Sequence, residues 1–244
     1  MNDPLLLLCY MSILFAANVL GAVGGFGAGM ISIPFLTQLF DAKAVIMAST
    51  MTCVLNLFIA VKNWRHVDLK RLFRILFYMC IGLPIGVYGL KTLDVDALKH
   101  LLGGFMLVIG GYGIMKLWIP WAAGMHLPAW ALRGCLIAGG IVQGAISSGG
   151  SLILLYAQQE LEEKNRFRAT MALLWTIVSL ITVLQYMLMG TLNRESLRLF
   201  AAGVLPVLSG IFAGGLLCRR LSQRAFAYVI NILIMFAGMI SLCR

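Results

Sequence analysis

The sequence predicts an all-α integral membrane protein made of two inverted repeats, each with a broken or re-entrant helical hairpin followed by three transmembrane helices. Apolar residues make up 61% of the 244 positions, charged residues only 11%, and the mean hydropathy is +0.95, which leaves too little polar surface for a water-soluble protein. Small-residue clusters interrupt an apolar segment in each half of the chain. The distribution of basic residues favours an odd number of single crossings per half.

Eight long apolar segments with short polar connections define the predicted elements. The first repeat, residues 1–122, is predicted to contain a hairpin over 5–40 and spans at about 44–61, 72–90 and 98–119. The second repeat, residues 123–244, is predicted to contain a hairpin over 130–159 and spans at about 169–190, 197–218 and 225–243. The six single segments have the length of a helix that crosses a bilayer.

The first hairpin is predicted from glycines in an uncharged stretch, where they weaken a helix: Gly21, Gly24, Gly25, Gly27 and Gly29. The arm over 5–20 would reach about 24 Å as a helix, whereas the hydrocarbon core is about 30 Å thick. We therefore expect two short arms that meet near the midplane. Two complete crossings would give the same topology, and this alternative stays open.

Two matched segments indicate an internal repeat. GFGAGMISIP (25–34) aligns with SSGGSLILLY (147–156) at an offset of 122 residues, which is half the chain. ASTMTCVL (48–55) aligns with RATMALLW (168–175) at an offset of 120, so that Thr50 pairs with Thr170. Membrane proteins built from such repeats place binding sites at broken helices near the midplane.

The basic residues decide between two topologies. If all eight segments crossed once, ten Lys and Arg residues would lie on one side and nine on the other. If 5–40 and 130–159 return to the side they entered from, the distribution is thirteen against six. The positive-inside rule favours the second arrangement, in which the two halves are inverted and the richer side is cytoplasmic. The net charge of +10 is thus a topology signal and does not predict nucleic-acid binding.

The two breaks are predicted to bind an anion. Glycine allows close approach to backbone N–H groups, and the helix that follows each break presents its positive N-terminus. No basic residue is expected deep in a span, so these N–H groups and nearby hydroxyl and amide side chains would form the site. The candidate residues are Gly25, Phe26, Gly27, Ala28, Gly29, Thr50, Asn56, Gln143, Ser147, Ser148, Gly149, Gly150, Ser151, Thr170 and Thr176.

Other site classes lack support in the sequence. The six cysteines and three histidines show no metal-ligand spacing, so no metal and no cofactor are predicted. No nucleophile, base and orienting group cluster together, so the chain is not expected to be an enzyme. Isolated polar residues such as Asn18 and Asn231 are more simply interpreted as helix–helix hydrogen bonds.

The two small-residue clusters resemble the motif of the TauE/SafE family, a Gly-apolar-Gly-Gly-Gly run followed by Pro. Residues 25–34 match it except at Ala28; in residues 147–156, Gly149 and Gly150 match while Tyr156 replaces the Pro. The resemblance implies a multi-pass carrier in the bacterial cytoplasmic (inner) membrane. It would move small sulfur-containing anions such as sulfite, sulfoacetate or related organosulfonates, usually outward. The partners expected are this anion and the bilayer, and homo-oligomer formation is left open. An anion channel that uses the turns as a filter is the alternative.

Overall fold

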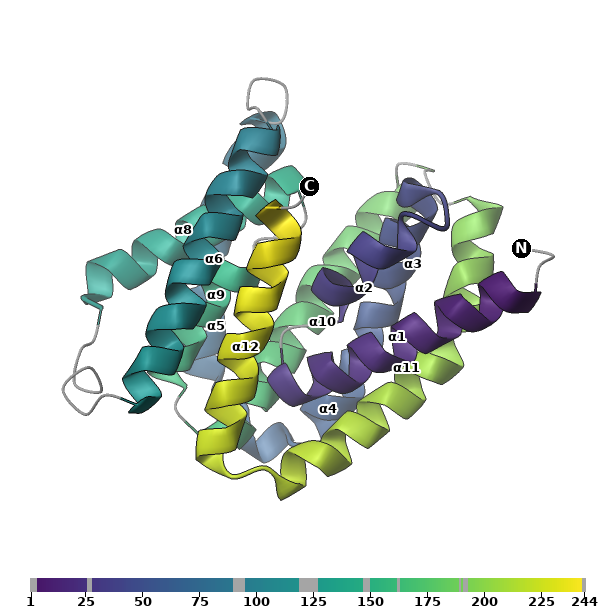
Figure 1. Cartoon of the computed structure of the whole chain (residues 1–244). Helices are drawn as coiled ribbons and strands as arrows, with labels where there is room; N and C mark the ends of the chain where they lie inside the picture. Colours follow the sequence, from purple (N-terminus) through teal and green to yellow (C-terminus); the bar gives the residue numbers. More distant parts are fainter. Residues whose placement is uncertain are drawn as a thin grey trace. The chain divides into compact units, whose positions relative to one another are not determined.

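The computed structural model describes residues 4–25, 28–89, 95–118, 127–146, 150–161, 163–188, 190 and 193–242. These residues form helices and connections with no strand among them (Figure 1). In chain order the helices are α1 (Pro4–Gly24), α2 (Gly29–Leu36), α3 (Ala42–Cys53), η1 (Val54–Asn56), α4 (Leu57–Lys62), η2 (Trp64–His66), α5 (Leu69–Gly89), α6 (Val95–Trp118), α8 (Ala129–Ile146), α9 (Gly150–Glu160), α10 (Lys164–Leu188), α11 (Arg194–Arg220) and α12 (Gln223–Leu242).

The helices coincide with the predicted apolar segments. Within the described residues, four helical stretches are long and apolar enough to cross a membrane: Pro4–Gly24, Ala44–Lys62, Lys164–Leu184 and Arg194–Arg220. Shorter apolar helices cover Met106–Trp118, Ala129–Gln143 and Gln223–Phe236. The all-helical, multi-pass prediction is therefore confirmed for this part of the chain.

Both predicted breaks separate two helices. α1 ends at Gly24 and α2 begins at Gly29, while α8 ends at Ile146 and α9 begins at Gly150. The predicted span over 44–61 is also interrupted, since the 3₁₀ turn η1 lies between α3 and α4. Such a turn inside a helical stretch marks a local departure from α-helical hydrogen bonding.

The chain reverses direction at both breaks. Phe40, just beyond α2, packs edge-on against Tyr10 in α1, with ring centroids 5.4 Å apart. Gln159, near the end of α9, pairs with the backbone of Leu127, just before α8. The Leu127 N–H donates to Gln159 Oε1 at 3.0 Å, and Gln159 Nε2 donates to the Leu127 carbonyl at 2.9 Å. The second arm of each hairpin thus returns to the start of the first.

The first arm is longer than the sequence analysis expected. α1 contains 21 residues and therefore measures about 31 Å, whereas the eight residues of α2 measure about 12 Å. The prediction of an arm ending near residue 20 was wrong. Glycine weakens an isolated helix, but in the folded chain α11 packs against α1 and stabilises its last turn. A Cβ at Gly210 would lie 2.8 Å from the Phe15 carbonyl oxygen, and one at Gly214 would lie 2.9 Å from Ala22 Cβ. This close packing keeps α1 helical as far as Gly24.

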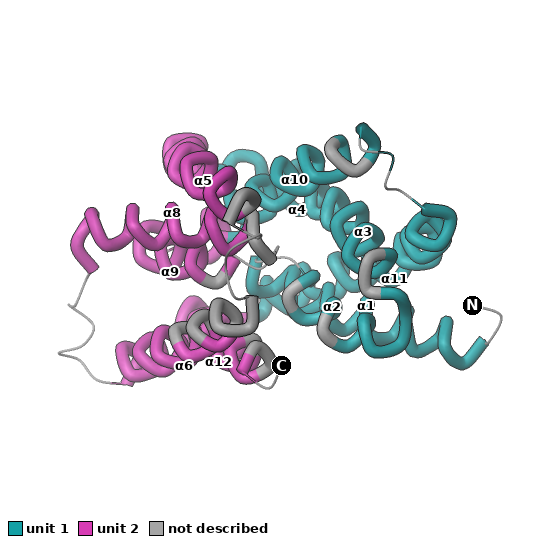
Figure 2. Tube along the Cα trace, turned by 90° about the horizontal axis from the view of Figure 1, so that it is seen from above, with its two compact units in different colours: residues 1–67, 168–220 teal, residues 68–167, 221–244 magenta. Residues whose placement is uncertain are grey.

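The chain forms two compact units (Figure 2). Unit 1 contains residues 1–67 and 168–220, and unit 2 contains residues 68–167 and 221–244. Each unit therefore combines helices from both halves of the sequence. The core of unit 1 is apolar and includes Tyr10, Leu36 and Leu199, with the Tyr10 hydroxyl donating to the Leu199 carbonyl at 2.8 Å.

The contacts between the two halves are reciprocal. In unit 1, α1 from the first half packs against α11 from the second, and in unit 2, α8 from the second half packs against α5 from the first. Both partner helices contain an internal proline, Pro84 in α5 and Pro206 in α11. These prolines are 122 residues apart, the offset that aligns the two small-residue clusters.

The remaining close pair in unit 2 joins α6 to α12. Gly103, near the start of α6, approaches Gly238 and Leu242 near the end of α12. Gly113, near the end of α6, approaches Asn231 in the first half of α12. The last described helix of each sequence half therefore packs against the other in the antiparallel direction.

Candidate functional site

The first break brings the end of α1 and the start of α2 together. Gly25 has a φ of 72°, and its N–H donates to the Gly21 carbonyl at 2.7 Å. The Ala28 carbonyl accepts from the N–H groups of Ile31 and Ser32 at 3.0 and 2.9 Å, and from the Ser32 hydroxyl at 3.1 Å. No side chain of a described residue caps α2. An uncapped helix N-terminus suits the anion that the sequence analysis predicts at this position.

Replacing Gly25 by alanine is expected to destabilise the protein by about 1–2 kcal/mol, because a left-handed backbone brings a Cβ too close to the carbonyl oxygen. Gly29→Ala is the matched control, since a Cβ there would make an ordinary 3.5 Å contact with Ile33 Cδ1. Thermal unfolding of both variants in detergent measures the difference. Equal midpoints for the two variants would contradict the assigned strain.

Arg168 lies at the same break, and here the sequence analysis was wrong. The predicted span begins at about residue 169, so Arg168 was expected in the connection before it, and no basic residue was expected deep in a span. In the structure this side chain is only 6% exposed, and its Nε donates to the Ala22 carbonyl at 2.7 Å. Ala22 carries one of the last four carbonyls of α1, which have no partner within the helix. The arginine thus closes the end of α1, and its guanidinium also contacts the Cys218 side chain.

A signal for this burial was present in the repeat alignment. Arg168 is the first residue of RATMALLW, where it pairs with the buried Ala48 of ASTMTCVL. The nearby Lys164 and Arg166 favour the opposite interpretation, because three basic residues so close together are typical of a solvated connection. Arg166 is indeed exposed and paired with Glu163, so only one of the two neighbouring arginines is buried.

The buried polar residues that the structure describes include one cation and no anion. Among the residues whose burial is described, Arg168 is the only charged side chain in the buried set, and the others are Asn, Ser and Thr. The Trp175 indole N–H, on the same helix as Arg168 and 7% exposed, has no hydrogen-bond acceptor among the described residues. Unit 1 therefore buries hydrogen-bond donors and one positive charge.

The predicted site residues divide between the two units. Unit 1 contains those of the first break together with Thr50, Asn56, Thr170 and Thr176, and unit 2 contains Gln143, Gly150 and Ser151. Phe26, Gly27, Ser147, Ser148 and Gly149 lie outside the described residues. The convergence of the two breaks on one site stays a prediction.

The candidate hydroxyl and amide groups make local hydrogen bonds. Thr50 donates to the Ile46 carbonyl and Thr176 to the Ala172 carbonyl, each at 2.8 Å within its own helix. Asn56 donates to Cys53 Sγ at 3.3 Å within the interrupted span. Each hydroxyl oxygen keeps acceptor capacity while its proton is used by the helix. These contacts position the side chains without involving the break.

A charged cluster lies outside the apolar segments, at the start of α5. Arg71 forms ion pairs with Asp68 at 2.6 Å and with Glu160 at 3.3 Å. Burial alone would raise the pKa of Asp68, but hydrogen bonds from the Arg71 backbone and guanidinium, with the charges of Arg71 and Arg166, hold it below its ordinary value. Asp68 and Glu160 are therefore neutralised locally and connect α5 with the end of α9.

The sequence profile of the sulfite exporter TauE/SafE family matches residues 10–240. No curated protein and no solved structure matches the chain. The match includes both breaks, all the helices that flank them and Arg168. Together with the long apolar helices, it identifies a multi-pass membrane protein of a family of transporters. The chain belongs to the TauE/SafE sulfite exporter family.

Proposed function

We propose that this protein is a secondary carrier that exports small sulfur-containing anions, such as sulfite or an organosulfonate, across the bacterial cytoplasmic membrane. Transport would proceed by alternating access around the two breaks after α1 and α8. The observation that carries the proposal is the buried Arg168 guanidinium at the first break.

A buried cation needs a compensating partner, because removing a charge from water costs several kcal/mol. The described contacts of Arg168 are to the Ala22 carbonyl and the Cys218 side chain. An anionic substrate would supply the missing charge. Ionisable side chains inside membrane segments commonly mark substrate pathways. The planar guanidinium also suits two oxygens of one oxyanion.

Neutral donors would complete the coordination of the anion. The α2 N-terminus, which has no side-chain cap, supplies N–H groups and a partial positive charge at the break that Arg168 reaches. The Trp175 indole lies seven residues beyond Arg168, which places both on one face of α10. Thr50, Asn56, Thr170 and Thr176, together with the serines of the second break, remain proposed site residues.

The helix contacts support an inverted repeat. The first arm of each hairpin packs against the proline-containing helix of the other half, and the last helices of the two halves, α6 and α12, are antiparallel partners. Equivalent helices related by a two-fold axis in the membrane plane would make these contacts. Such an arrangement provides two related breaks of opposite orientation for alternating access.

Export is favoured by the membrane potential. Moving one negative charge out of a cell with a negative interior gains about 2.3 kcal/mol per 100 mV. No buried carboxylate, the usual proton-coupling group, is found among the residues whose burial is described. The potential can therefore supply the driving force without a proton.

In proteoliposomes, the purified protein is expected to move radiolabelled sulfite or sulfoacetate at a rate that saturates with concentration. A carrier saturates because each cycle binds one substrate at a limited number of sites. Flux that remains linear and reaches channel rates would instead support the anion channel. No flux and no thermal stabilisation with sulfite, thiosulfate, sulfoacetate or taurine would overturn the proposal.

A further inference from the structure

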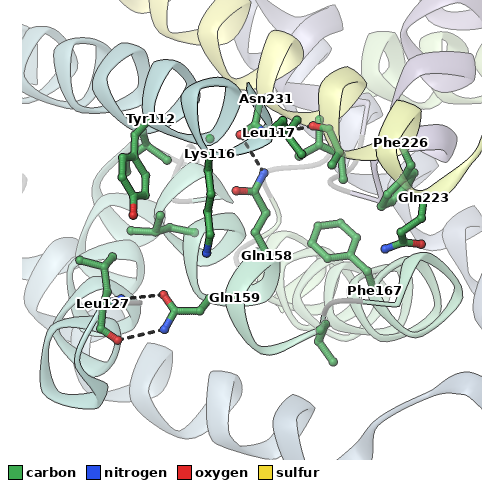
Figure 3. A pocket seen from close by; sticks show the side chains of 16 residues that line it. Tyr112, Lys116, Leu117, Leu127, Gln158, Gln159, Phe167, Gln223, Phe226 and Asn231 are labelled. Carbon is green, nitrogen blue, oxygen red and sulfur yellow. Dashed lines mark hydrogen bonds between the residues drawn. The ribbon is translucent and has the colours of Figure 1, made fainter. Parts of the chain in front are cut away.

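Unit 2 contains a cavity of about 330 Å³ between α6, α9 and α12 (Figure 3). The last turns of α6 and α9 and the first half of α12 line it. A volume of this size lies at the lower end of the range of small-molecule sites. None of the candidate residues that the structure describes lines it, so it is a separate feature of the molecule.

The cavity has an apolar wall and a polar wall. Phe167 and Phe226 form the apolar wall and meet edge to face, with ring centroids 5.8 Å apart. Lys116 and Tyr112 of α6 lie opposite, and Figure 3 shows the Lys116 side chain extending from α6 toward Gln158 and Gln159 of α9. The two walls together suit a molecule with an apolar body and a polar head.

The charge of the lining selects an anion. Among the described residues that line the cavity, Lys116 is the one with a charged side chain. Two further cations lie next to lining residues: Arg224 donates to the Leu117 carbonyl at 3.0 Å, and the backbone N–H of Lys164 donates to Gln223 Oε1 at 3.2 Å. All three cations belong to the side that the charge distribution predicts to be cytoplasmic.

Hydrogen bonds hold the amides of the polar wall in place. Gln158 Nε2 donates to Asn231 Oδ1 at 3.3 Å, and Asn231 Nδ2 donates to the Ala227 carbonyl at 2.8 Å (Figure 3). Asn231 can occupy this position because residue 113 is glycine, where a Cβ would collide with the Asn231 side chain. The polar wall is therefore formed before a ligand arrives.

The cavity is connected to the second break by one helix. α9 begins at Gly150, directly after the break, and Gln158 lies eight residues further, about 12 Å along the axis. A ligand in the cavity would thus contact the helix whose N-terminus forms part of the proposed transport site. This position is suitable for a site where substrate is captured before it moves to the break.

We propose that this cavity is a cytoplasmic capture site for small organic anions, with the anionic head at Lys116 and a short hydrocarbon body against Phe167 and Phe226. The inference rests on the proposed transport function and specifies its substrate class. It assigns a preference for alkanesulfonates over sulfite, because sulfite has no hydrocarbon body to occupy the apolar wall.

Transport of butanesulfonate and sulfite by wild type and Lys116→Gln tests the inference. The variant is expected to raise the KM for butanesulfonate about 10-fold, the effect of losing one charge-assisted contact. The KM for sulfite should change less than about 2-fold, because sulfite cannot use the apolar wall and would reach the breaks without occupying the cavity. An equal change for both anions, or for neither, would overturn the capture site.

Gly113→Ala provides a second variant that keeps the charge. Its methyl group displaces Asn231 and should raise the KM for butanesulfonate selectively. Gly111→Ala is the matched control on the same helix, because a Cβ there has no neighbour within 4 Å. If Gly113→Ala and Gly111→Ala transport butanesulfonate alike, the inference is wrong.

Two further measurements separate the sources of failure. If the wild-type protein moves neither anion, the proposed transport function is refuted. If the wild-type protein moves both anions and the variants transport them equally well, only the capture site is refuted. Native mass spectrometry of the detergent-purified protein tests a lipid as occupant. A lipid retained by wild type and lost from Lys116→Gln would overturn the capture site.

Discussion

Arg168→Gln is expected to lower sulfite flux in proteoliposomes by roughly 10- to 100-fold, the effect of losing about 1.5–3 kcal/mol of charged hydrogen bonding to the anion. Glutamine keeps a polar side chain but removes the positive charge that the 6% exposed arginine places at the end of α1. Arg168→Lys keeps the charge without the planar fork and should retain intermediate flux. Initial rates at several sulfite concentrations measure the effect.

Arg166→Gln is the matched control, because Arg166 lies two residues away on the same helix but is exposed and paired with Glu163. It should transport sulfite at the wild-type rate. Thermal unfolding separates binding from folding, since loss of the charged hydrogen bond to Ala22 alone should cost about 1.5–3 kcal/mol of stability. A folded Arg168→Gln variant with normal flux would remove Arg168 from the proposed site.

Gly82→Ala is expected to destabilise unit 2 by about 3 kcal/mol or more, because the backbones of α5 and α8 meet at this residue. A Cβ at Gly82 would collide with the Ile137 carbonyl oxygen and lie 2.8 Å from the Ile141 nitrogen. Backbone atoms cannot rotate away as a side chain can, so the two helices must separate. The Gly82→Ala variant should unfold at a lower temperature than wild type in detergent, and it should also transport more slowly.

Gly134→Ala tests the same change on α8 without the contact. No atom lies within 4 Å of a Cβ at Gly134, and alanine favours a helix over glycine by about 0.5–1 kcal/mol. This variant should unfold at the same temperature as wild type or a higher one. If both variants lost stability to a similar extent, the close approach of α5 and α8 would not explain why residue 82 is glycine.

Much of the secondary structure could be predicted from the sequence, because a bilayer imposes strict demands on length and polarity. The predicted spans at 72–90, 98–119 and 197–218 correspond to α5, α6 and α11. The ends of α1 and α8 near the small-residue clusters were also predictable, since such residues weaken a helix wherever packing does not support it. The exact last residue was less predictable: α1 continues to Gly24 because α11 packs closely against it.

Some features of the candidate site could be predicted from the sequence, and others could not. Gly25 and the α2 N-terminus lie at a break, as expected. Arg168 was missed because an arginine that is close to Lys164 and Arg166 in the sequence is expected to be exposed to water. Its burial depends on the end of α1, which lies 146 residues away in the sequence and has a carbonyl that needs a donor.

The sequence alone predicted three features: membrane insertion, the position of the breaks and membership of the TauE/SafE family. They follow from hydropathy, glycine content and motif spacing, which are local properties of the chain. Three features depended on the folded chain: the pairing of α1 with α11 and of α8 with α5, the burial of Arg168, and the cavity beside Lys116. Each requires contact between segments distant in sequence. The free energy of such contacts comes from the shape and charge of both partners, which neither segment specifies by itself.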